Sequence, residues 1–306
     1  MRTPFRVTLA VSLAIFALAV AALPSLPDLF ERKDVLLSTE SRYQNIYVTQ
    51  QGNVLMLRAG SLKSRSSAID LKSPFRHVIE YTGLMMVGLG YVEEPKSFLV
   101  LGLGGGAVTR HLRRYYPQAQ ITSVELDPAV VEIAQSHFGF QPDGQSKVVV
   151  EDARRFLART SETYDVIFLD AYHGDYIPFH LLTREFLELV RARLRDGGAV
   201  VANTWSKQQL YERESATYAA VFEGFHSYLG QESTNRIVVA TREPAASYST
   251  LEKQFSTIQK RRSFGEVDLP ALLHRHFDRD LSWPADTPLL TDDYAPVNFL
   301  VQGENR

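Results

Sequence analysis

Short apolar runs recur along the middle of the chain, and each is followed by a segment whose apolar residues have helical spacing. A near-continuous apolar run indicates a strand buried on both faces, whereas the helical spacing indicates an amphipathic helix. The strands predicted in this way are SFLVLGL, QITSVELD, KVVVEDA, YDVIFLD, AVVANTW and the late RIVVATRE. The helices predicted between them are GAVTRHLRRYYP, PAVVEIAQSHF and LTREFLELVRARLRDGG.

This alternation predicts an α/β protein with a parallel, Rossmann-like sheet that carries helices on both faces. Such sheets bind ligands beyond the carboxyl ends of their strands, so we look for functional residues there. The helix before the fifth strand is expected to stop at Gly197 and Gly198, since glycine commonly ends helices.

The flanking segments carry weaker patterns. Residues 28–42 are predicted to be a linker, and residues 43–50 and 54–60 flank a glycine turn, which indicates a hairpin. The stretch PFRHVIEYTGLMMVGLGYV is predicted to be a helix under the main sheet, and LEKQFSTIQKRR a short amphipathic helix followed by loop. We therefore divide the chain into an N-terminal segment (1–27), a linker with a small β element (28–75), a Rossmann-like catalytic domain (76–245) and a C-terminal extension (246–306).

The N-terminal segment is apolar. Arg2 and Arg6 precede the uncharged stretch 7–23, whose length lies between that of a signal peptide and that of a membrane-spanning helix. A signal anchor, a cleaved signal peptide and a buried helix are the three interpretations. With an anchor, the protein is membrane-associated, and the two arginines place the remaining chain outside.

Composition narrows the chemistry. The 306 residues are 45% hydrophobic and 22% charged, which suits a large α/β domain with small additions. The formal net charge is −2, so the cationic face that nucleic-acid binding requires is not expected. The absence of cysteine excludes disulfides, cysteine-ligated zinc and thiol nucleophiles.

Glycines and acids follow four consecutive predicted strands. Gly102, Gly104 and Gly105 lie between the first strand and its helix, where glycine allows a ligand to approach the backbone. Glu125 ends the second strand, where an acid can accept hydrogen bonds from ribose hydroxyls. Asp152 and Asp170 end the third and fourth. Their common register predicts one crevice that binds an adenosyl ligand. A dinucleotide site is the weaker alternative, because it gives no reason for the last two acids.

With these residues in place, the chain resembles the spermidine synthase family of polyamine aminopropyltransferases, and in particular the spermidine-synthase-like branch with an N-terminal membrane segment. The supporting stretches are SRYQNIYV, YTGLMM, VLGLGGGAVTRHL, SVELDPAVVEIA, EDARRFL, YDVIFLDAY, TREFLELVRARLRDGGAVVANTW and TDDYAPVN. The resemblance implies a class I methyltransferase-like sheet preceded by a small β element.

The resemblance also implies roles for individual residues. Gln44, Glu125 and Asp152 would hold the nucleoside of decarboxylated S-adenosylmethionine, and Tyr81 and Asp170 would act on the attacking amine of a diamine. A carboxylate can bind an ammonium and then remove its proton. The sulfonium of the donor is already an excellent leaving group, so no metal is required. We expect the donor to be a co-substrate, with no tightly bound cofactor.

The sequence also departs from the family pattern in three places. Gly105 stands where the family's glycine loop carries an Asp, and His173 stands where a second acid follows the fourth strand. Thr82 and Gly83 stand where a His-Glu pair follows the tyrosine. Nearby candidates for binding the substrate's cationic groups are His173 itself, Asp175, Asp292 and Asp293.

The resulting hypothesis is aminopropyl transfer from decarboxylated S-adenosylmethionine to a diamine such as putrescine, with release of methylthioadenosine. Two alternatives stay open: a methyltransferase that uses S-adenosylmethionine, and a membrane-tethered nucleoside or polyamine sensor without activity. A homodimer is left open as an assembly. The location is ambiguous, because such donors are made in the cytoplasm, whereas the charge rule places the domain outside.

Overall fold

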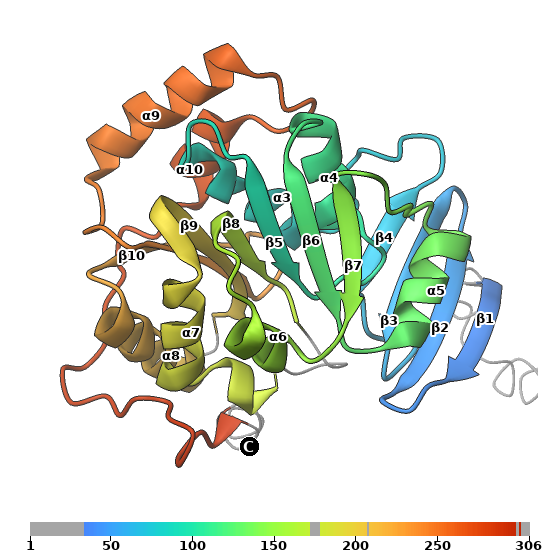
Figure 1. The fold of residues 1–306 in the computed structure, drawn as a ribbon, viewed down its shortest axis with the longest axis horizontal. Coiled ribbons are helices and arrows are strands. Elements are labelled where there is room, and N and C mark those ends of the chain that lie inside the picture. Colours follow the sequence, from blue (N-terminus) through green and yellow to red (C-terminus); the bar gives the residue numbers. More distant parts are fainter. Residues whose placement is uncertain (1–33, 172–177, 207, 298–299, 301–306) are drawn as a thin grey trace, which may run out of the picture.

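The computed structural model of the protein describes residues 34–171, 178–206, 208–297 and 300. Its main sheet has the strand order β10-β11-β9-β8-β5-β6-β7, and the strands from β9 to β7 are parallel (Figure 1). The two strands β10 and β11 extend this sheet in antiparallel fashion. The bounds are Ser97–Leu101 (β5), Gln120–Glu125 (β6), Ser146–Val150 (β7), Tyr164–Leu169 (β8), Leu194–Trp205 (β9), Phe225–Leu229 (β10) and Asn235–Thr241 (β11).

Helices cover both faces of this sheet, as the sequence predicts. On one face, alternate strand residues such as Val100 and Phe168 pack against α3 (Glu80–Leu84), the 3-10 helix η1 (Met85–Gly90), α4 (Ala107–Tyr115), α9 (Tyr248–Arg261) and α10 (Leu269–His276). On the other face, residues such as Leu99 and Ile167 pack against α6 (Ala153–Arg159), α7 (Arg184–Ala192) and α8 (Gln208–Val221). The strands are buried on both sides, which explains their continuous apolar runs.

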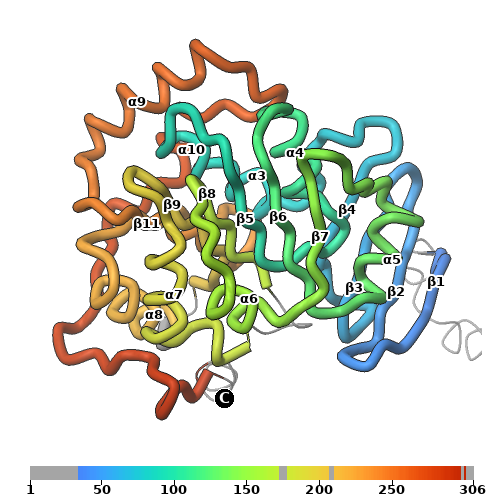
Figure 2. The backbone as a smooth tube through the Cα atoms, in the orientation of Figure 1, coloured from blue at the N-terminus to red at the C-terminus, as the bar shows by residue number. Residues whose placement is uncertain are grey.

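A second, antiparallel sheet precedes the main one. It has the order β1-β2-β3-β4, with bounds Asp34–Glu40, Asn45–Gln51, Val54–Ala59 and Ser67–Asp70. Helix α5 (Pro128–His137) packs on it through Val130, Ile133 and Phe138, which join Ile46 and Leu57 in one apolar cluster. Figures 1 and 2 show α5 lying along β2 and β3, so this helix ties the small sheet to the main one.

Several elements differ from the prediction. The hairpin over residues 43–60 is present, but β1 occupies residues 34–40 of the predicted linker and β4 extends the sheet. Helix α7 ends at Ala192 rather than at Gly197, because Leu194 already pairs with Tyr164 of β8. The segment before β5 is helical only from Glu80.

The C-terminal part contains α9, as predicted, and in addition α10, which the sequence analysis assigned to loop. Asp268 caps α10 by accepting a hydrogen bond from the backbone N–H of Ala271, and Pro270 lies in its first turn. The division of the chain into the four segments named above stays a prediction.

The membrane location predicted from the sequence requires correction. No helix in the part of the chain that the structure describes is long and apolar enough to cross a membrane. The stretch 7–23, on which that prediction was based, lies outside the described residues.

Candidate active site

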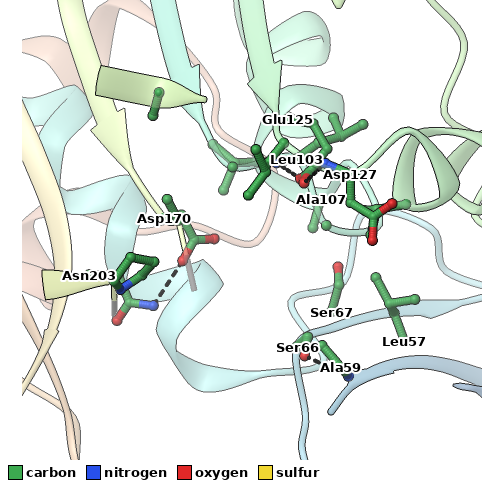
Figure 3. Close-up of a pocket in the computed structure, with 18 of the residues that line it drawn as sticks. Leu57, Ala59, Ser66, Ser67, Leu103, Ala107, Glu125, Asp127, Asp170 and Asn203 are labelled. Atoms are coloured by element: carbon green, nitrogen blue, oxygen red, sulfur yellow. Dashed lines mark hydrogen bonds between the residues drawn. The ribbon is translucent and has the colours of Figure 1, made fainter. Parts of the chain in front are cut away.

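A cavity of about 410 Å³ opens at the carboxyl ends of the parallel strands, facing the small sheet (Figure 3). Residues from both sheets line it, among them Leu57 and Ala59 of β3 and Ser66 and Ser67 before and at the start of β4. Of the residues predicted to form the site, those that line the cavity are Gln44, Tyr81, Gly102, Gly104, Glu125, Asp152 and Asp170. The strand register therefore brings the predicted acids to one place.

The glycine turn after β5 is shaped by close backbone contact. Gly102 has a φ of +96°, and a Cβ atom there would lie 2.3 Å from the carbonyl oxygen of Asp170. Glycine is the residue that combines this conformation with so close an approach. The turn thus holds the ends of β5 and β8 against each other, beside the cavity.

Glu125 is fixed by the backbone of that turn. Its carboxylate accepts hydrogen bonds from the N–H of Leu103 (2.9 Å) and from the N–H of Asp127 (3.0 Å). Burial raises the pKa of Glu125, while the N–H groups of Asp127, Leu103 and Gly104 oppose the rise. The residue therefore presents an oriented carboxyl group to the cavity, which suits vicinal hydroxyl groups.

Two further polar groups lie toward the same part of the cavity. The Oε1 atom of Gln44 is buried and has no hydrogen-bond partner in the described part of the chain. Asp152 caps α6 through the N–H of Arg155, and its second oxygen lies 3.1 Å from Nε2 of His180. A buried polar atom without a partner is costly, so Gln44 fits a site where a ligand supplies the missing hydrogen bond.

Asp170 has a different environment. Its Oδ1 accepts a hydrogen bond of 2.9 Å from Nδ2 of Asn203 at the end of β9 (Figure 3). Burial raises the pKa of Asp170 to about 7, the hydrogen bonds from Asn203 and Tyr81 oppose the rise, and the charge of Glu125 adds to it. A carboxylate with a pKa near neutrality is suited to taking a proton.

Tyr81 stands beside this carboxylate. Its hydroxyl donates to the carbonyl of Ser66 (2.7 Å), and burial together with Asp170 raises its pKa well above the usual value. The phenol therefore stays protonated, and its oxygen faces both the backbone of the small sheet and Asp170.

Gly105 does not line the cavity, although the sequence analysis placed it in the binding site. A Cβ atom at this position would lie 2.8 Å from Oγ of Ser67 and 2.9 Å from the ring of Phe138. The acid that the family pattern has here would collide with these two side chains. The packing of the small sheet and α5 therefore explains the glycine.

Two of the remaining candidate residues, Asp292 and Asp293, are described and do not line the cavity. Asp292 forms a bidentate ion pair with Arg154 of α6 and accepts a hydrogen bond from Thr183, and the bonds from Arg154 lower its pKa. Asp293 is exposed in the adjoining turn. His173 and Asp175 lie outside the described residues.

The cavity also contains polar residues that the sequence analysis did not assign to the site. Asn203 could have been found by the same register argument, because it lies near the carboxyl end of the fifth parallel strand. His180, Arg65 and Asn235 had no such signal, since the first two come from a 3-10 helix and from the loop between β3 and β4, and the third begins the antiparallel strand β11. Among the residues that the structure describes, no group of three or more His, Asp or Glu side chains is placed to hold a metal ion.

Fold and cavity together define an α/β protein with a glycine turn and the carboxyl groups of Glu125, Asp152 and Asp170 gathered around one cavity. Residues 78–229 match the family model of the spermine/spermidine synthase domain. A polyamine aminopropyltransferase of Vibrio vulnificus is 33% identical over 276 residues, which cover 87% of this chain and 91% of the relative. The chain belongs to this family of transferases.

Solved structures agree on the fold. A probable spermidine synthase from Corynebacterium glutamicum has a TM-score of 0.63 at 21% identity, covering 82% of this chain and all of the other. Human methyltransferase-like protein 13 has a TM-score of 0.54 at 22% identity, covering 68% of this chain and 96% of the other. These likenesses confirm the predicted class I methyltransferase-like architecture.

Proposed function

We propose that this chain transfers an aminopropyl group from decarboxylated S-adenosylmethionine to a diamine such as putrescine and releases methylthioadenosine. The observation that carries the proposal is the placement of Asp170. This half-buried carboxyl group, with its pKa near 7, shares one cavity with the nucleoside-binding candidates Glu125 and Gln44.

In this proposal the donor's nucleoside occupies the part of the cavity beside the glycine turn. The carboxylate of Glu125 accepts hydrogen bonds from the two ribose hydroxyls, and the unpaired Oε1 of Gln44 accepts another from the donor. Asp152, at the end of the next strand, lies where the adenine amino group can reach it. The donor is a co-substrate that leaves as methylthioadenosine.

The acceptor amine arrives as an ammonium, since the pKa of a free diamine is near 10. Asp170 binds this ammonium and takes one proton from it. The nitrogen lone pair then attacks the carbon attached to the sulfonium, and the electrons of the broken carbon–sulfur bond return to sulfur. Because the sulfonium is already a good leaving group, alignment of nitrogen, carbon and sulfur supplies most of the remaining acceleration.

The far end of the acceptor meets uncharged side chains. The described residues around Asp170 on this side are Thr82, Asn203, Trp205, Ser233, Thr234 and Asn235. We therefore propose a low affinity for diamines, with His173 and Asp175 as the candidates for binding the second amine.

A homodimer stays a prediction. Light scattering tests it by measuring the mass of the protein in solution.

The direct test is release of methylthioadenosine from decarboxylated S-adenosylmethionine with putrescine, measured by chromatography. We expect release that depends on both substrates. Absence of release with putrescine, cadaverine and agmatine, while methylthioadenosine binds tightly, would exclude aminopropyl transfer to these amines.

One observation favours a second candidate, transfer from intact S-adenosylmethionine. Arg65 lines the cavity and forms no ion pair with any other described residue, and Gly105 supplies no acid for a free aminopropyl ammonium. A guanidinium suits the carboxylate that the intact donor retains. Calorimetry on the wild type and on Arg65→Ala compares the affinities for the intact and the decarboxylated donor. If the wild type binds the intact donor more tightly and Arg65→Ala removes that preference, transfer from intact S-adenosylmethionine is favoured.

A further inference from the structure

A chain of hydrogen bonds leads from Asp170 to the rim of the cavity. Asn203 donates from Nδ2 to Asp170, and its Oδ1 accepts from Nδ2 of Asn235 at 2.9 Å. The backbone N–H of Asn235 in turn donates to Oγ of Ser233 at 3.3 Å, and this hydroxyl donates to Glu80 at 2.8 Å. Both amide side chains line the cavity, at the start of β11 and near the end of β9.

The two amides have a defined direction. A side-chain amide has a donor end and an acceptor end, and an ionised carboxylate only accepts. The amide nitrogen of Asn203 can face Asp170 only while its oxygen faces a donor on the other side. Asn235 is that donor. If Asn235 supplied an acceptor instead, the amide of Asn203 would turn, and its oxygen would face the carboxylate of Asp170.

We propose that Asn235 is a positioning residue for aminopropyl transfer: it fixes the amide of Asn203 so that Asp170 is held in the ionised form that accepts the proton of the amine. The proposal rests on the proposed function, in which Asp170 is the proton acceptor.

The outer end of this chain is itself anchored. Glu80 accepts hydrogen bonds from the N–H groups of Gln231 (2.6 Å) and Glu232 (3.1 Å) as well as from Ser233. Burial acts to raise the pKa of Glu80, but these three bonds lower it overall. The charged carboxylate therefore ties the turn before Asn235 to α3, the helix that carries Tyr81. The same helix thus positions a cavity tyrosine and the start of the amide chain.

Two other titratable groups face Asp170 from the described elements packed around it. Glu125 of β6 repels its charge, and the hydroxyl of Tyr81 on α3, which donates its proton to the carbonyl of Ser66, opposes the rise in the pKa of Asp170. Both act on the carboxylate independently of Asn235, since no hydrogen bond joins either of them to the amide pair. A change at Asn235 consequently tests the amide chain alone.

The test is a titration of Asp170 by carbon-13 NMR of labelled aspartate carboxyl groups in ligand-free protein, with assignment by Asp170→Asn. Asn235→Asp replaces the hydrogen-bond donor with an acceptor and also adds a negative charge. We therefore expect it to raise the pKa of Asp170 by about one unit more than a control variant that adds only the charge. The control variant is Thr234→Asp. Thr234 is the neighbouring residue, it also lines the cavity, and its side chain makes no hydrogen bond to Asn203. Asn235→Ser, whose shorter side chain ends before the oxygen of Asn203, removes the donor without adding a charge and should give a smaller shift than Asn235→Asp.

The titration does not require turnover, so it separates this proposal from the proposed function. Equal shifts in Asn235→Asp and Thr234→Asp would overturn the proposal, because charge alone would then explain them. If the protein is active, the acidic limb of its kcat profile should move in the same order, with Asn235→Asp lowering kcat at neutral pH about tenfold. An unmoved profile in Asn235→Asp would also overturn the proposal. Methylthioadenosine binding checks the fold of each variant. Asn235→Ala replaces any variant that fails to fold, and its expected shift in the pKa of Asp170 lies between those of Asn235→Ser and Asn235→Asp.

Discussion

At the scale of single residues, two carboxyl groups in one cavity are given different properties by their surroundings. Glu125 is bound by backbone N–H groups of the glycine turn, whereas Asp170 receives side-chain hydrogen bonds only. Burial raises the pKa of both, but only Asp170 is raised to about 7. The first is suited to holding hydroxyl groups and the second to exchanging a proton.

Glu125→Gln should weaken methylthioadenosine binding by about 1.5–3 kcal/mol, the usual contribution of hydrogen bonds to a charged group. Glutamine keeps the shape of the side chain but offers a single acceptor oxygen. Calorimetric titration measures the effect, and the exposed Glu132→Gln on α5 is the control. Equal affinities in the two variants would remove Glu125 from the nucleoside site.

Asp170→Asn should lower kcat by roughly 10²–10⁴, the range for loss of a general base, with methylthioadenosine affinity retained. In the wild type, the rate should rise with pH through about 7, because Asp170 must be ionised to accept a proton. The pH profile of kcat/KM measures this, and the highly exposed Asp196→Asn serves as the control. Turnover that survives in Asp170→Asn would exclude Asp170 as the base.

At the scale of elements, the site depends on how closely the strand ends approach one another. The turn after β5 passes so near the end of β8 that no Cβ atom fits at Gly102. Asn203 reaches Asp170 because β9 runs parallel to β8 in the adjacent position of the sheet.

Gly102→Ala should therefore cost about 3 kcal/mol or more of stability, since it combines a left-handed conformation with overpacking against the backbone of Asp170. Gly139→Ala is the matched control: its φ is +65°, and no atom lies within 4 Å of the added Cβ. That variant should lose only the conformational part, about 1–2 kcal/mol. Urea denaturation compares them, and equal losses would show that the close approach is not what selects glycine.

The strand register explains how much of this site the sequence could predict. Glu125, Asp152 and Asp170 follow apolar runs that end at one edge of a parallel sheet, so their shared cavity follows from pattern alone. The second half of the cavity comes from the small sheet and from β11, whose antiparallel pairing leaves no comparable signal. The ion pair of Asp292 escaped the sequence for a related reason: its partner Arg154 lies 138 residues away, and no local pattern relates the two.

At the scale of the whole molecule, buried acids make stability depend on pH. Burial raises the pKa of Glu214 in α8 to about 8, with Arg236 and Thr204 opposing the rise, and burial raises that of Asp170 to about 7. Unfolded Asp and Glu titrate near 4. Between the unfolded pKa near 4 and these raised folded values, the folded state binds more protons than the unfolded state. The free energy of unfolding therefore falls as pH rises.

We expect the ligand-free protein to lose about 2 kcal/mol of stability between about pH 6.5 and 8.5. Buried His77, His111 and His226, whose pKa values are lowered, act in the opposite direction below this window and in its lower part, because unfolded histidine titrates near 6.5. Glu214→Gln should flatten the dependence because glutamine does not ionise. Urea midpoints across this pH range test it, with the exposed Glu252→Gln on α9 as control. A slope unchanged by Glu214→Gln would contradict the assignment.

The packing around Gly105 makes the effect of a substitution there depend on a second position. An Asp introduced alone meets the ring of Phe138 and the hydroxyl of Ser67, whereas a smaller residue at 138 alone leaves a void in a fully buried cluster. Each single exchange is harmful, but in the double variant the space lost at one position is returned at the other. Because a smaller residue at 138 relieves the ring contact while the shorter contact with Ser67 stays, we expect the effect of each exchange on stability to depend on the other position. Adding an acid at position 105 therefore requires a simultaneous change at position 138. Whichever of the two positions is changed first, the single variant is expected to be less stable than the wild type.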